Sequence, residues 1–135
     1  MVEYNKPLPE ITLDNKPFWD ACKRHELLLQ RCQDCGYIRL PSPICQKCLS
    51  MNSEWVRISG RGKVYTWVVI HQRYHAGFAE NLPYNVTIVE LEEGPRLITS
   101  IVGCKNEDLR IVMEVEVVFE DATDEITLPK FKPVS

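Results

Sequence analysis

The sequence has little that would place the protein in a membrane, outside the cell or on a nucleic acid. No apolar run approaches the roughly 20 residues that cross a bilayer, and the opening MVEYNKPLPE has neither the basic nor the apolar region of a secretory signal. Sixteen lysines and arginines stand against nineteen aspartates and glutamates, a formal net charge of -3. Without a membrane-crossing run or a secretory signal, we expect a soluble, cytoplasmic protein. Proteins that follow a phosphate backbone need a basic excess, so we disfavour nucleic acid as its partner.

Self-contained catalytic motifs are also missing. The sequence has no G-x-S-x-G, no glycine-rich phosphate loop and no dinucleotide-binding fingerprint. His71 and His75 are four residues apart but lie in or beside a predicted loop without a third ligand nearby, so we expect them to face solvent. Four carboxylates between residues 120 and 125 surround a turn, where we expect a solvated acidic tip; a general acid–base pair is the alternative. The sequence therefore predicts no catalytic residue.

Four of the six cysteines form two pairs with the spacing Cys32-x2-Cys35-x9-Cys45-x2-Cys48. In a reducing compartment, thiolates bind metals instead of forming disulfides. Gly36 follows the first pair, where backbone N–H groups must turn toward the sulfurs. Four thiolates in a tetrahedron suit Zn²⁺, and four protein ligands leave no open position for water or substrate. The spacing therefore predicts a structural zinc site; iron, as in rubredoxin, and four thiols without metal are the alternatives.

The segment before the cysteine pairs predicts an extended arm followed by one short helix. The first 16 residues contain prolines and no apolar periodicity, which is typical of an arm. A proline suited to a first helical turn then precedes Phe18, Trp19 and Cys22, which recur at helical spacing and predict an amphipathic helix over 17–25. We expect Cys22 and the isolated Cys104 to be inert buried thiols.

The remainder of the chain predicts β-structure. Aromatic and β-branched runs, alternating apolar positions and turn residues predict about five strands, within residues 55–70, 84–91, 96–102, 112–120 and 126–131. Glycines at 60 and 62 permit a bend in the first of them. Strongly curved strands of this number with a single helix are typical of an OB-fold barrel. We therefore expect a mainly β protein with an arm and helix (1–29), a zinc ribbon (30–53) and an OB-fold (54–135).

Several motifs together resemble a known family. They are the helix and first knuckle PFWDACKRHELLLQRCQDCG, the second cysteine pair, and the strand segments GRGKVYTWVVIH, PYNVTIVELEEGPRLITSIV and VEVVFEDATDEITLPKFKP. Over nearly the whole chain they resemble the DUF35 family, small proteins with an N-terminal helix, a rubredoxin-like zinc ribbon and a C-terminal OB-fold. The four paired cysteines match the zinc ligands of that family. Pro83-Tyr84 and Phe119-Glu120-Asp121 match its OB-fold signatures.

The resemblance implies an accessory subunit without a catalytic site of its own. Members of the family are partners of thiolase-fold enzymes that act on acyl-CoA thioesters, including thiolases, sterol-side-chain aldolases and polyketide-type acyltransferases, and others pair with hydratases. The partner supplies the catalytic residues, and the small subunit helps to assemble the complex and to hold the CoA part of the substrate. A degradative β-ketoacyl-CoA thiolase is the expected partner, in a complex with two copies of each chain.

Candidate contact residues follow from the chemistry of these partners. Phe18 and Trp19 are aromatic anchors for a protein partner, unless both rings pack on the chain's own barrel. CoA needs cations for its phosphates and a ring for its adenine, for which Arg61, Lys63 and Tyr84 are the candidates. Two rival functions remain open. The barrel and ribbon could bind nucleic acid through exposed aromatic rings, or the chain could be an enzyme by itself.

Overall fold

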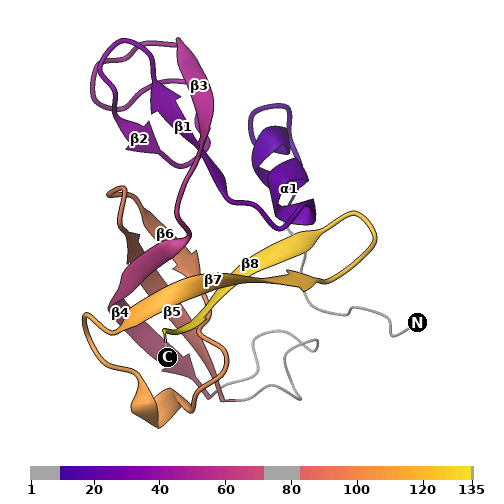
Figure 1. Cartoon of the computed structure of the whole chain (residues 1–135), viewed down its shortest axis with the longest axis vertical. Coiled ribbons are helices and arrows are strands. Elements are labelled where there is room, and N and C mark those ends of the chain that lie inside the picture. The colour runs from indigo at the N-terminus through magenta and orange to yellow at the C-terminus, as the bar shows by residue number, and fades with distance from the viewer. Residues whose placement is uncertain (1–9, 72–82, 135) are drawn as a thin grey trace.

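The computed structural model describes residues 10–71 and 83–134. This part of the chain is mostly strands with one α-helix and one short 3-10 helix, which confirms the predicted mainly β class (Figure 1). None of its helices has the length and apolarity needed to cross a membrane. The elements in chain order are α1 (Lys16–Lys23), β1 (Leu28–Cys32), β2 (Ile38–Arg39), β3 (Ser53–Arg57), β4 (Arg61–Ile70), β5 (Tyr84–Leu91), β6 (Arg96–Thr99), η2 (Asn106–Asp108), β7 (Glu114–Asp121) and β8 (Thr127–Pro133).

Helix α1 is shorter than the sequence predicts. It begins after Asn15, with a proline in the first turn as expected, and ends at Lys23 instead of continuing to His25. His25 takes a left-handed φ of 59°, and its N–H donates to the carbonyl of Cys22 at 2.9 Å. The N–H of Glu26 reaches back to Ala21, which completes a Schellman-type helix end.

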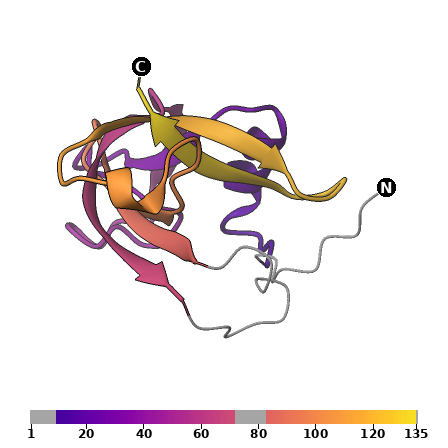
Figure 2. The same ribbon diagram turned by 90° about the horizontal axis from the view of Figure 1, so that it is seen from below.

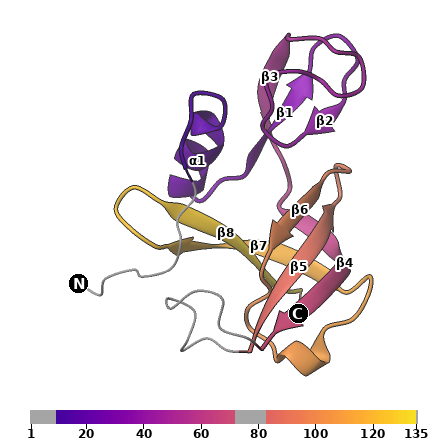
Figure 3. The same ribbon diagram turned by 180° about the vertical axis from the view of Figure 1, so that it is seen from behind.

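The left-handed His25 also connects the helix end to the β7–β8 hairpin. Its ring stacks on Phe119 with centroids 5.1 Å apart, and its Nε2 lies 3.2 Å from Oδ1 of Asp121. The hydroxyl of Thr127 donates to the same carboxylate oxygen at 2.7 Å. The Thr127 hydrogen bond and then the His25 contact lower the pKa of Asp121. The helix is thereby held beside the far end of this hairpin (Figure 3).

The first sheet has the order β2-β1-β3, and all of its pairs are antiparallel. Strand β3 pairs along the whole of β1, from Leu28 opposite Arg57 to Cys32 opposite Ser53. The sequence predicts a barrel strand that begins at residue 55. This start is wrong, because residues 55–57 belong to β3 and pair with β1. Gly60 has a φ of +76°, which interrupts the extended backbone between β3 and β4. A Cβ at this position would lie 2.5 Å from Cγ1 of Val117, so the site also requires glycine for space.

The second sheet has the order β6-β5-β4-β7-β8, which confirms the five predicted barrel strands. Ile101, two residues after the end of β6, forms a parallel bridge with Phe131 on β8, which brings the two edges of the sheet together. The curl of the sheet is visible from below (Figure 2). Buried side chains from the helix, both sheets and the connecting loops form one core. Its members are Phe18, Cys22, Leu27, Leu29, Ile58, Val64, Val89, Leu91, Ile101, Leu109, Val115 and Phe131.

Candidate metal centre

The first knuckle is a tight turn at the end of β1. The N–H of Cys32 donates to the carbonyl of Tyr37 at 2.9 Å, and the N–H of Gly36 donates back to the carbonyl of Cys32 at 2.9 Å. Gly36 has a φ of +78°, a conformation that glycine adopts without steric cost. The turn brings Cys32 and Cys35 to one side of the backbone loop, as the sequence predicts.

The second knuckle repeats the same hydrogen bonds. The N–H of Cys45 donates to the carbonyl of Ser50, and the N–H of Leu49 donates to the carbonyl of Cys45, both at 2.8 Å. Leu49 occupies the position of the glycine with a φ of 63°. A bulky residue in this conformation is strained, and its side chain is 76% exposed. The backbone preference of Leu49 therefore opposes the second turn, which other interactions must stabilise.

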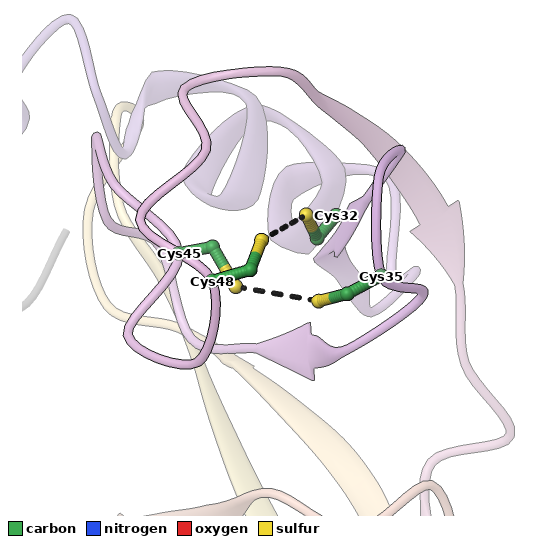
Figure 4. A group of neighbouring side chains, drawn as sticks. All are labelled: Cys32, Cys35, Cys45 and Cys48. Atoms are coloured by element: carbon green, nitrogen blue, oxygen red, sulfur yellow. Dashed lines mark hydrogen bonds between the residues drawn. The ribbon is translucent and has the colours of Figure 1, made fainter.

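The two knuckles bring all four sulfurs together (Figure 4). Every pair of Sγ atoms lies within 4.8 Å, with Cys32 and Cys48 3.5 Å apart and Cys35 and Cys45 3.6 Å apart. Zn–S bonds of about 2.3 Å in a tetrahedron require S···S edges of about 3.8 Å. The cluster therefore fits one tetrahedral ion, and no other group of three His, Cys, Asp or Glu in the described part of the chain fits one.

The environment of the four thiols favours thiolate at two of them. Backbone N–H groups, that of Cys35 first, lower the pKa of Cys32 to about 6. Burial raises the pKa of Cys45, but the backbone N–H groups of its own knuckle and the hydrogen bonds from the neighbouring thiols together outweigh burial and leave the pKa lowered. At Cys48 the N–H of Ser50 lowers the pKa, yet the neighbouring sulfurs outweigh it and raise the pKa to about 12. Without metal, the four sulfurs therefore cannot all be ionised at neutral pH, and binding a cation must displace protons.

Of the two cysteines outside the cluster, Cys22 is buried as expected and Cys104 is only half-buried. Cys22 is fully buried in the core, and burial raises the pKa of its thiol to about 12. Cys104 is half-buried, and burial, followed by the charge of Asp108, raises its pKa as well. Neither thiol has the low pKa that a nucleophile needs.

The predicted partner anchors lie at the inner side of the helix. Phe18 is 5% exposed and belongs to the core, and Trp19 is half-buried and packs against it. The two rings meet edge to face with centroids 4.9 Å apart. Their contact with a partner stays a prediction.

The structure brings together two of the three predicted CoA contacts. Arg61 and Lys63 are exposed neighbours on β4 and line a groove of about 350 Å³. Tyr84 lies opposite Ile70 at the other end of the β4–β5 pair, seven residues along β4 from Lys63, or roughly 23 Å at about 3.3 Å per residue. The assignment of Arg61 and Lys63 to CoA stays a prediction, and Tyr84 lies apart from them.

The remaining candidate positions are the two loop histidines and the acidic turn. His71 is exposed at the end of β4, and His75 lies outside the described residues. In the acidic turn, Glu120 pairs with Lys130, and Asp121 is held by the contacts with His25 and Thr127. The solvated acidic tip and the acid–base pair both stay predictions.

Sequence reasoning missed two buried polar residues of the ribbon. Gln30 is 6% exposed and Arg39 is 3% exposed, and they lie directly opposite each other on β1 and β2. Polar residues alternate with apolar ones in any half-exposed strand, so the local pattern gave no signal that these two turn inward. Both side chains contact Ser42, in the loop between the knuckles.

Comparison with known proteins identifies both parts of the chain. A family described as "ChsH2, rubredoxin-like zinc ribbon domain" matches residues 19–52, and one described as "ChsH2, C-terminal OB-fold domain" matches residues 55–120. The first match contains the whole cysteine cluster. The OB-fold and the four-cysteine ribbon predicted from the sequence are therefore confirmed.

Complete proteins give the same result. The chain is 39% identical to a probable enoyl-CoA hydratase alpha subunit of Thermomonospora curvata over 95% of its own length but only 40% of that relative. It is 42% identical to a DUF35 domain-containing scaffold protein of Methanocaldococcus jannaschii, covering 83% of this chain and 84% of the relative. A solved structure titled "Ltp2-ChsH2(DUF35) aldolase" superposes with a TM-score of 0.84 and 38% identity, over 93% of this chain and 98% of that one. The chain belongs to the DUF35 family.

Proposed function

We propose that the chain is the non-catalytic, zinc-binding scaffold subunit of a thiolase-type enzyme complex that acts on acyl-CoA thioesters. The observation that carries this proposal is the closed set of four sulfurs. When all four positions of a tetrahedral ion are protein thiolates, the ion has no position for water or substrate and stabilises the fold alone. The proposal therefore gives the metal a structural role and the chemistry to a partner.

The relatives support a partnership of this kind. One is named a scaffold protein, one is named as a subunit of an enoyl-CoA hydratase, and one is part of an aldolase with Ltp2. The matched chain of the Ltp2-ChsH2(DUF35) aldolase is covered over 98% of its length, which supports a similar place for this chain in an enzyme complex. The thiolase fold of the partner, and two copies of each chain, rest on the family resemblance.

The ribbon offers a surface for such a partner. Leu49 is 76% exposed and Met51 is 74% exposed, and both follow the last cysteine of the second knuckle. Ile44, 43% exposed, precedes that knuckle. Apolar side chains that protrude from a rigid turn are suited to an interface because little conformational entropy is lost when they are covered. Since the knuckle needs the metal for its shape, binding of the partner should depend on zinc.

The proposal extends to CoA at one place only. Arg61 and Lys63 would contact the phosphates at their groove, which the partner would share. Glu90, Glu92 and Glu114 also line it, so three carboxylates oppose two cations and the groove alone should bind an anion weakly. Tyr84 is too distant to stack on an adenine attached to those phosphates.

Co-expression with a candidate thiolase-type partner tests the proposal, and we expect such a partner to be encoded beside this chain. We expect the two to co-purify in equal amounts and the acyl-CoA activity to require both chains. Leu49→Ser with Met51→Ser should weaken the complex and leave zinc bound, whereas Cys45→Ser should lose both. A partner that is soluble and fully active alone would refute the scaffold role.

Two further results would each favour a rival function. Cleavage or condensation of an acyl-CoA by the isolated chain would make it an enzyme. Salt-sensitive binding of an oligonucleotide would favour the nucleic-acid module, and we expect none at low salt.

A further inference from the structure

Arg39 is a buried cation without a counter-charge in the described part of the chain. Its side chain donates one hydrogen bond, from Nη2 to the carbonyl of Ser42 at 3.1 Å. Its Nε and Nη1 are buried and have no hydrogen-bond partner there. Burying an uncompensated guanidinium is costly, because the charge loses its hydration and gains nothing in return. A negative charge close to Arg39 would remove this cost.

The sheet register places Arg39 on the side of the metal cluster. Arg39 on β2 is directly opposite Gln30 on β1, so their side chains leave the same face of the sheet. Cys32 is two residues beyond Gln30 on β1 and therefore shares that face. Four thiolates around one Zn²⁺ carry a net charge of about -2. With zinc bound, the four-cysteine centre is therefore a concentrated negative charge on the same face of the sheet as Arg39.

Arg39 and Gln30 also hold the loop that leads to the second knuckle. Oε1 of Gln30 accepts the N–H of Ser42 at 2.8 Å, while Arg39 donates to the carbonyl of the same residue. Ser42 lies three residues before Cys45 and in turn donates from its hydroxyl to the carbonyl of Ile44 at 3.0 Å. The pair therefore holds both backbone groups of one residue in the approach to Cys45.

We propose that Arg39 is the internal counter-cation of the tetrathiolate centre and strengthens metal binding through its charge, beyond its part in holding Ser42. It is a positioning and charge-compensating residue and does not ligate the metal. This inference rests on metal binding by the four cysteines, and it does not depend on the enzyme partner.

Zinc affinity of three variants, measured by competition with a chromophoric chelator, separates charge from packing. Arg39→Met removes the charge and the Ser42 contact, and we expect an affinity loss of about 10–100-fold, the usual effect of losing a group just outside the ligands. Gln30→Glu keeps an acceptor for the Ser42 N–H but neutralises Arg39 from the facing strand. We expect it also to lower the affinity, by about tenfold or more. The comparison variant, Gln30→Met, removes the acceptor of the Ser42 N–H and leaves the charge of Arg39. Its affinity loss therefore reports the loop contact alone, and we expect it to be at least about threefold smaller than that of Arg39→Met.

Three results would overturn the proposal. The first is an affinity of Arg39→Met within about twofold of the parent. The second is an equal loss in Gln30→Met and Arg39→Met together with an unchanged Gln30→Glu, which would reduce Arg39 to a loop contact. The third is full zinc retention by Arg39→Met with loss of the partner complex, which would mean that the counter-charge is a carboxylate of the partner. Should Arg39→Met fail to fold, Gln30→Glu against Gln30→Met still decides.

Discussion

Removing the metal should unfold the ribbon and leave the barrel folded. Between residues 33 and 52 only Arg39 and Cys45 are fully buried, and the half-buried Ile38 is the one aliphatic or aromatic side chain of this segment that packs against the core. Structural zinc supplies an apparent free energy of about 10–16 kcal/mol in small domains, as much as the whole stability of a typical domain. The segment has nothing to replace it. Val64, Val89 and Val115, which are core residues on barrel strands, lie outside this segment.

Hydrogen exchange read by mass spectrometry, with and without a zinc chelator, measures this difference directly. We expect the amides of Cys32, Gly36, Cys45 and Leu49, which are hydrogen-bonded in the knuckles, to lose most of their protection after chelation. Amides of β4, β5 and β7 should keep theirs within about tenfold, because exchange there requires opening of the barrel itself. Cys45→Ser should reproduce the chelated pattern without any chelator.

The reasoning would be refuted by a ribbon that stays protected after its metal has been removed. That result would mean that the knuckles are held by their own hydrogen bonds. Simultaneous loss of protection in the barrel would refute it differently, because it would show that the two sheets unfold as one cooperative unit.

Three further predictions concern single positions. Gly36→Ala should destabilise the zinc-loaded protein by about 1 kcal/mol in urea unfolding, since a φ of +78° disfavours any Cβ although no neighbour lies within 4 Å. Leu49→Gly, at the same place in the other knuckle, should not destabilise the protein. Equal losses of stability in the two variants would contradict the conformational argument. Asn85→Ala should cost about 2–4 kcal/mol by thermal unfolding, because the buried Asn85 amide bonds both the N–H and the carbonyl of Ile101 at 2.8 and 2.9 Å; a loss below about 0.5 kcal/mol would contradict it. Zinc binding at pH 7 should release at least one proton, since Cys48 with a pKa of about 12 is protonated in the metal-free chain. Zinc affinity should therefore fall as pH falls. Titration calorimetry that gave the same heat in buffers of different ionisation enthalpy would disprove the proton release.

The parts of the fold that the sequence predicted are those governed by short-range patterns. Two cysteine pairs with fixed spacing define a metal site because each pair needs only one tight turn. Alternation with a period of two predicted the strand at 112–120, and Val115 on its apolar face is buried in β7. The helix was expected for the same kind of reason, and its buried Phe18 and Cys22 lie on the predicted apolar face.

The parts that the sequence did not predict depend on contacts between distant residues. A strand pattern does not say which sheet a strand joins, so β3 was assigned to the barrel although it pairs with β1. The helix was expected to reach His25, but a left-handed residue ends it, and histidine gives a weaker signal for this conformation than glycine does. Burial of Arg39 and Asn85 arises from neighbours far along the chain, which no local pattern contains.

The central claim is that the ion is enclosed by sulfur and therefore takes no part in bond-making. X-ray absorption at the zinc edge of the purified protein tests it most directly. We expect a single shell of four sulfur neighbours at about 2.3 Å, unchanged when an acyl-CoA is added. An oxygen or nitrogen neighbour in the first shell, or a shell that changes with the thioester, would contradict a purely structural metal and return the chemistry to this chain.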